Sequence, residues 1–115
     1  MGDRGNIVVD RVWLYTHWGG SNVKIDLQKA LQRHLRWDDA PYLTRIIFDQ
    51  MKGNDFGETG FGISINKVDN EHNILFVDCD NQIVIEKDEE GEEIKRWTFE
   101  EYVRAKFSEE DEEEE

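Results

Sequence analysis

The chain has 115 residues, the length of one domain, and its 27 acidic and 14 basic residues give a net charge of −13. This charge argues against direct binding to nucleic acid or to an anionic membrane, since both require lysine and arginine. No apolar run approaches the ~20 residues that span a membrane, and the polar start lacks the apolar core of a secretion signal. The single cysteine, Cys79, forms no internal disulfide, so we expect a cytoplasmic protein.

The chain begins with a predicted hairpin. Residues 6–9 and 12–16 are rich in β-branched and aromatic side chains, which favours two strands. Asp10 and Arg11 are the turn residues between them. One bent strand is the alternative.

Two helices are expected next. Apolar residues at a 3.6-residue spacing predict a helix over about 23–35, with Leu35 at the end of its buried stripe. Ser21 or Asn22 is its expected N-cap. A second helix begins after Asp38-Asp39, because Pro41 suits a first helical turn, and Gly53-Asn54 ends it.

The second half of the chain predicts several strands joined by short turns and then a last helix. The expected strands are residues 61–65, 74–77, 82–86 and 94–97, the last of these at an edge. Thr98-Phe99-Glu100-Glu101 has the pattern of a capping box, which opens the final helix.

The predicted order of elements is β-β-α-α-β-β-β-β-α. Consecutive strands joined by tight turns favour an antiparallel arrangement. We therefore predict an α+β fold with an antiparallel sheet of four to six strands and two or three helices packed on one face. Residues 1–107 are expected to form a single domain, and 108–115 a disordered acidic tail, because seven of these eight residues are acidic.

The clearest candidate site is the glycine turn after the aromatic stretch Trp13-Leu14-Tyr15-Thr16-His17-Trp18. Bare amides at a helix N-terminus favour anions, and glycine lets a ligand approach the backbone. The candidate ligand-binding residues are Tyr15, His17, Trp18, Gly19, Gly20, Ser21, Asn22 and Arg45. The alternative is a plain strand-to-helix turn with core aromatics, and for Arg45 a salt bridge instead of an anion clamp.

No catalytic or metal-binding set emerges from the sequence. His17, His34 and His72 do not fall at the spacing of metal ligands. Cys79 lies between two aspartates, which raise a thiol pKa and weaken the nucleophile. We predict a protein that is not an enzyme, with no catalytic residues, no metal and no cofactor.

Residues 12–20, Val-Trp-Leu-Tyr-Thr-His-Trp-Gly-Gly, resemble a motif of small uncharacterised bacterial and phage-encoded proteins. In these proteins an aromatic-x-His-Trp-x-Gly-Gly turn precedes a helix, and Thr44-Arg45-Ile46-Ile47 and Glu58-Thr59-Gly60-Phe61-Gly62-Ile63-Ser64 match the segments that follow. The resemblance covers roughly residues 4–86. It implies a shared fold and no activity, and by analogy a role in phage–host interaction.

Two functions remain open at this stage. The first is a non-catalytic, phage-related interaction protein whose acidic surface binds a basic protein partner and imitates the charge of nucleic acid. The second is a binding protein for a small anionic ligand, phosphate- or nucleotide-like, held by the Tyr15–Asn22 turn. In the second case Gly20→Val should abolish binding without unfolding the domain.

Overall fold

A computed structural model describes residues 2–55, 57, 59–67 and 70–107. Within these ranges the chain forms six strands, which are β1 (Gly5–Val9), β2 (Val12–Thr16), β3 (Phe61–Ser64), β4 (Ile74–Asp78), β5 (Ile83–Lys87) and β6 (Glu93–Thr98). The helices are α1 (Val23–Leu31), α2 (Ala40–Lys52) and α3 (Phe99–Arg104), with a 3-10 turn, η1 (Gly20–Asn22), before α1. The predicted order of strands and helices and the α+β class are confirmed. The predicted tail, 108–115, lies outside the described residues.

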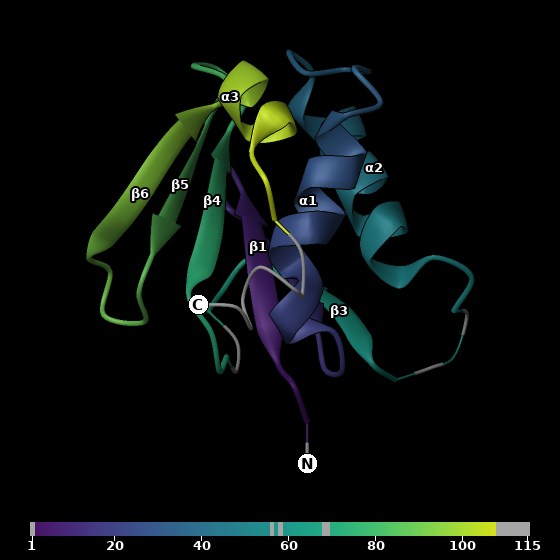
Figure 1. Ribbon diagram of the computed structural model, residues 1–115. Helices are drawn as coiled ribbons and strands as arrows, with labels where there is room; N and C mark the ends of the chain where they lie inside the picture. The colour runs from purple at the N-terminus through teal and green to yellow at the C-terminus, as the bar shows by residue number, and fades with distance from the viewer. Residues whose placement is uncertain (1, 56, 58, 68–69, 108–115) are drawn as a thin grey trace.

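The strands form one mixed sheet in the order β3-β2-β1-β4-β5-β6 (Figure 1). Four of the five strand pairs are antiparallel, but β1 and β4 run parallel, with Ile7 opposite Leu75. The prediction of an antiparallel sheet was therefore wrong in its centre. Tight turns connect β1 to β2 and, separately, connect β4, β5 and β6 in sequence. Strand β3 pairs with β2. The chain then returns from this edge to the middle of the sheet, where two strongly apolar strands meet.

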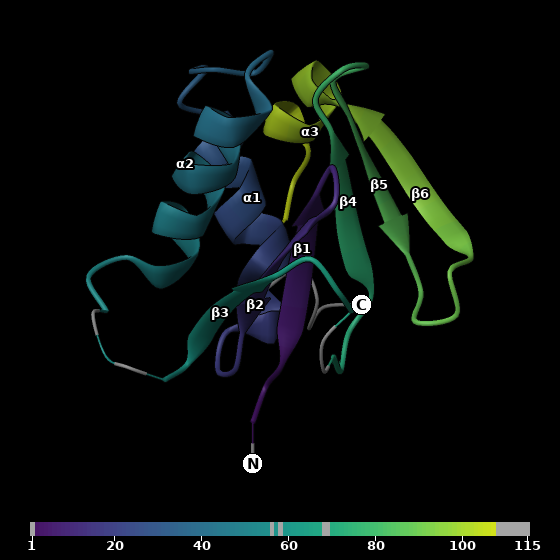
Figure 2. The same cartoon turned by 180° about the vertical axis from the view of Figure 1, so that it is seen from behind.

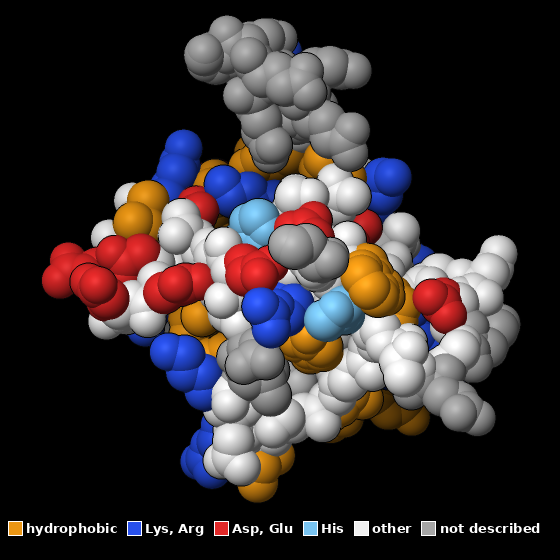
Figure 3. Space-filling view, turned by 90° about the horizontal axis from the view of Figure 1, so that it is seen from below, with side chains coloured by type: hydrophobic (Ala, Val, Ile, Leu, Met, Phe, Trp, Pro, Cys, Tyr) orange, Lys and Arg blue, Asp and Glu red, His pale blue; other side chains and the backbone are white. Residues whose placement is uncertain are grey.

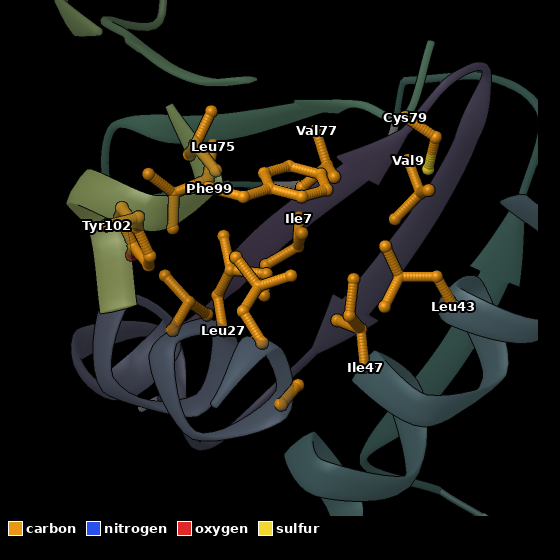
Figure 4. Packing of buried hydrophobic residues seen from close by; sticks show 14 of the residues in the cluster. Ile7, Val9, Leu27, Leu43, Ile47, Leu75, Val77, Cys79, Phe99 and Tyr102 are labelled. Atoms are coloured by element: carbon orange, nitrogen blue, oxygen red, sulfur yellow. The ribbon is translucent and has the colours of Figure 1, made fainter. Parts of the chain in front are cut away.

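All three helices pack on one face of the sheet, as expected (Figures 1 and 2). The core lies between the layers: Ile7 and Val77 on the sheet face Leu27 on α1 and Ile47 on α2 (Figure 4). Phe99 and Tyr102 bring α3 into the same cluster. Each of these side chains is almost fully buried, and burying one apolar side chain of this size contributes roughly 1.5–3 kcal/mol. None of the described helices is long and apolar enough to cross a membrane.

The first helix is shorter than its apolar pattern predicts. α1 ends at Leu31, and His34 and Arg36 have φ angles of 55° and 61°, which a right-handed helix does not tolerate. Leu35, expected on the buried stripe, is 54 % exposed. The indole Nε1 of Trp37 donates to the carbonyl of Leu31 at 3.1 Å. The helix thus ends where Trp37 folds back on its last turn.

Both ends of α2 and the start of α3 follow their sequence signals, whereas Asn22, at the N-cap position of α1, makes no side-chain capping hydrogen bond. Pro41 lies in the first turn of α2, and Gly53 ends that helix with a φ of 54°. At α3 the Thr98 hydroxyl accepts from the amide of Glu101, and the Glu101 carboxylate accepts from the amide of Thr98. The predicted capping box is confirmed.

Hydrogen bonds between distant segments fix α3 against α1. The buried Gln28 side chain donates to the carbonyl of Tyr102 at 3.1 Å, and the Tyr102 hydroxyl donates to the carbonyl of Lys24 at 2.9 Å. These bonds give partners to polar groups that the core would otherwise leave unpaired. They also hold the first turn of α1, which forms one wall of the site described next.

Candidate functional site

Three of the predicted site residues form a compact cluster at the end of β2. The hydroxyl of Tyr15 lies 2.7 Å from Nδ1 of His17, and the His17 and Trp18 rings meet edge to face at 4.2 Å. Trp18 is 60 % exposed, and Gly60, just before β3, lies beside its indole nitrogen. The cluster therefore presents one exposed indole, while its imidazole already has an internal partner.

The glycine turn does not offer free amides. The amide of Gly19 donates to the Thr16 hydroxyl, that of Gly20 to the Asp3 carbonyl, and that of Asn22 to the Gly19 carbonyl. The amide of Ser21 donates to the Asp3 carboxylate at 3.0 Å. The predicted anion cradle is thus occupied from within the chain, and Asp3 supplies the negative charge that a helix N-terminus favours.

Asp3 also connects this turn to the start of β4. The hydroxyl of Ser21 donates to Oδ2 of Asp3 at 2.7 Å, and Nε2 of His72 lies 2.5 Å from Oδ1. Burial raises the pKa of Asp3, but hydrogen bonds from Ser21 and His72 and the charge of the imidazole outweigh it and leave the pKa below its ordinary value. We call Asp3, Ser21 and His72 the Asp3 latch.

Gly20 packs directly against the backbone next to the Asp3 latch. A Cβ atom at this position would lie 2.6 Å from the Asp3 carbonyl oxygen and 2.7 Å from the carbonyl carbon of Arg4. Backbone atoms this close cannot move aside cheaply. The expectation that Gly20→Val leaves the domain folded is therefore not supported, and the glycine is required by close packing.

Arg45 lies apart from the glycine turn. Its side chain is exposed on α2, where Nε is 3.4 Å from the Asp49 carboxylate one turn later. Arg45 lines a shallow hollow on the outer surface of that helix with Pro41, Tyr42 and Ile46. The structure thus supports the salt-bridge alternative for Arg45, and none of its contacts with described residues directs this guanidinium at the turn.

Two adjacent hollows open at the end of the molecule that carries the Asp3 latch. The first, which we call the interior pocket, has a volume of about 230 Å³ and is lined by Gly20, Ser21, Val23, Lys24, His72, Asn73, Leu75 and Glu86. The second, which we call the acidic hollow, measures about 340 Å³ and is lined by Glu71, His72, Asn73, Asp88, Glu89 and Glu90. Acidic side chains gather over the β5–β6 turn (red, at left in Figure 3).

Sequence reasoning found part of this region. Gly20 and Ser21 belong to the predicted site and line the interior pocket, whereas Asp3, Glu86 and the pairing of His72 were missed. Glu86 follows apolar residues in its strand. It lies opposite Leu75 on the neighbouring strand, so its side chain faces the helices. A charged residue at an inward strand position is a signal that the sequence did contain.

The described residues contain no group of three or more His, Cys, Asp or Glu side chains that could hold a metal ion. Cys79 is buried, and burial together with four nearby aspartates raises the pKa of its thiol to about 12. A thiol of this kind is almost fully protonated near neutral pH and is a poor nucleophile. This agrees with the argument made for Cys79 from its neighbours.

Comparisons of the chain with protein-family models, with curated proteins and with solved structures found no match. The resemblance to bacterial and phage-encoded proteins therefore stays a prediction.

Proposed function

We propose that this protein is a non-catalytic binding protein whose acidic hollow takes up basic side chains of a protein partner. The observation that carries the proposal is the concentration of four carboxylates, from Glu71, Asp88, Glu89 and Glu90, around one concave surface. A concave surface lined by one sign of charge focuses the field and attracts the opposite charge.

Internal contacts orient these carboxylates but neutralise few of them. Glu71 is paired with Arg4, whose hydrogen bonds lower the pKa of that carboxyl. Oδ1 of Asp88 accepts from backbone amides, and Oε2 of Glu89 accepts from the side-chain amide of Asn70. Among the described residues, Glu71 alone of the four has a cationic partner, so the hollow keeps a negative charge.

The chemistry of the partner follows from this arrangement. Arginine presents a planar fork of donors that matches carboxylate geometry, and lysine presents a compact point charge. The net charge of −13 adds long-range attraction and raises the rate of encounter with any basic surface. Because Glu71, Glu89 and Glu90 are exposed, salt should weaken the complex.

The alternative function, a phosphate- or nucleotide-like ligand on the Tyr15–Asn22 turn, has lost its main support. Its premise was a set of free amides at Gly19–Asn22, and each of these four amides already has an acceptor. The phage–host role stays a hypothesis by analogy with the resembling proteins. We also keep the absence of catalysis as a prediction, which the high pKa of Cys79 supports.

An arginine-rich synthetic peptide tests the proposal. Its affinity is measured by fluorescence anisotropy at low and high salt, for the wild type and for a Glu89→Gln/Glu90→Gln variant. A matched variant, Asp38→Asn/Asp80→Asn, removes the same charge from exposed positions away from the hollow. We expect about a fivefold loss of affinity in the first variant, equivalent to roughly 1 kcal/mol, and less than about a twofold loss in the second.

Equal losses in the two variants would show that net charge alone attracts the peptide. Affinity that does not change with salt would contradict an electrostatic interface. Either result would overturn the assignment of the acidic hollow as the binding surface.

A further inference from the structure

The interior pocket is chemically different from the acidic hollow beside it. It lies between the first turn of α1 and the strands β4 and β5, and it carries both a cation, Lys24, and an anion, Glu86. Gly20, Val23 and Leu75 line it as well and contribute small or apolar surface. The proposed binding of a basic partner makes no use of this pocket.

Glu86 is the unusual residue here. Its side chain projects toward the helices, in register with Leu75, and the residue is only 6 % exposed. Burying a carboxylate costs several kcal/mol unless partners compensate, and replacing a buried ion pair by apolar residues is often neutral or stabilising. A carboxylate at this inward position therefore needs partners close by.

The partners of Glu86 lie on one side of its carboxylate. Lys24 Nζ is 3.2 Å from Oε2, and the side-chain amide of Asn73 donates to the same oxygen at 3.0 Å. Neither contact involves Oε1. An ammonium group has three donors, and the Lys24 side chain is 37 % exposed, so it has room to bind a second anion while remaining near Glu86.

The opposite charges of Lys24 and Glu86 favour a ligand that itself carries one positive and one negative group. An anion alone would pair with Lys24 and weaken the ion pair between Lys24 and the buried Glu86. A cation alone would pair with Glu86 and weaken the same ion pair from the other side. A molecule with an ammonium and a carboxylate a few bonds apart satisfies both at once. The volume of about 230 Å³ is below the range of roughly 300–1,000 Å³ that is typical for drug-sized ligands, which limits the ligand to a compact one.

We propose that the interior pocket binds a small zwitterion of the α-amino-acid type, with the ligand ammonium on Glu86 and Asn73 and its carboxylate on Lys24. The walls formed by Gly20, Val23 and Leu75 leave space for a short side chain only. The pocket thus gives this protein a second binding function beside the acidic hollow, with which it shares His72 and Asn73.

Glycine, L-alanine and L-serine are the probes, and acetate and methylamine are the controls that each carry one half of the zwitterion. Binding is followed by amide chemical shifts in two-dimensional NMR and by the thermal midpoint. We expect perturbed amides at Lys24, Asn73 and Glu86 with the amino acids, and a midpoint raised by about 10 °C at a hundredfold excess over Kd. The two controls should give much smaller effects.

Glu86→Gln keeps the shape of the side chain and removes its charge, and Glu92→Gln removes one exposed carboxylate outside the pocket as the matched control. We expect Glu86→Gln to weaken amino-acid binding at least about tenfold, and Glu92→Gln to leave it unchanged. If Glu86→Gln fails to fold, the chemical-shift map of the wild type decides the matter.

Three results would overturn the proposal. One is the absence of shifts at the pocket with all three amino acids up to tens of millimolar. Another is an equal response to acetate or methylamine alone. The third is undiminished amino-acid binding by folded Glu86→Gln.

Discussion

Removing the Asp3 carboxylate should loosen the junction between the start of the chain, η1 and β4. In Asp3→Ala the Ser21 amide and hydroxyl lose the acceptor that lies 3.0 and 2.7 Å away, and His72 loses its partner at 2.5 Å. The backbone bonds of residue 3 to His17 and Gly20 remain. The substitution therefore measures the contribution of the Asp3 side chain alone to the free energy of unfolding.

The expected loss is about 2 kcal/mol. Loss of a side-chain acceptor at a helix N-terminus costs about 0.5–2 kcal/mol, and a partly exposed ion pair adds at most about 1 kcal/mol. About a third of the Asp3 side chain is exposed to solvent, which screens its charge. We therefore do not add the larger free energy that a buried, charged hydrogen bond would contribute. For a domain of this size such a loss lowers the thermal midpoint by about 8 °C.

The loss should depend on pH in a defined direction. The folded pKa of Asp3 lies below its ordinary value of 3.8, so its contribution is complete above that value and disappears as the pH falls through the folded pKa. Urea unfolding of wild type and Asp3→Ala at about pH 7 and about pH 3 measures this, with the exposed Asp38→Ala as control. A loss under about 0.5 kcal/mol at neutral pH, or one that is undiminished in acid, would refute the reasoning.

Four further predictions follow from single residues. Burial raises the pKa of Asp26 to about 6, so Asp26→Asn should stabilise the protein by about 1 kcal/mol near pH 7 and by nothing near pH 4, as urea unfolding will measure. Gly20→Ala should cost more than about 3 kcal/mol, read from the thermal midpoint, because its Cβ meets the Asp3 carbonyl at 2.6 Å; a stable variant would contradict this packing. Thr98→Ala removes the capping box of α3 and should cost about 1 kcal/mol in urea unfolding, whereas Thr98→Ser should cost little. Cys79, with a thiol pKa of about 12, should react with a thiol reagent near pH 8 only after denaturation. Rapid labelling of the native protein would contradict the raised pKa of this thiol.

Several elements were readable from neighbouring residues alone. The hairpin at Asp10 and Arg11, the start of α2 at Pro41 and the capping box at Thr98 all formed as predicted. Signals of this kind act over a few residues, where backbone sterics and local hydrogen bonds decide the conformation. The late end expected for α1 failed because Leu35 fits the helical period, while His34 and Arg36 take positive φ angles that the period does not report.

The candidate site was only partly readable, for a different reason. The aromatic cluster and the glycine turn are contiguous in sequence, but they contribute to different places. The side chains of Tyr15, His17 and Trp18 gather beside Gly60, whereas Gly20 and Ser21 line the interior pocket. The acceptors that occupy the turn, however, come from Asp3, and the imidazole that pairs with Asp3 is 69 positions away. A sequence shows which groups can donate, but it does not show which donors a distant segment has already used.

Composition, periodicity and turn chemistry by themselves determined the acidic character, the element order and the α+β class of this protein. Only the tertiary structure decided the parallel pairing of β1 with β4, the occupation of the glycine turn by Asp3, and the meeting of Lys24 with Glu86 in one pocket. Local free energies depend on neighbours along the chain, whereas these three features depend on how segments distant in the chain pack together. Packing is a property of the whole chain, so no short segment specifies it.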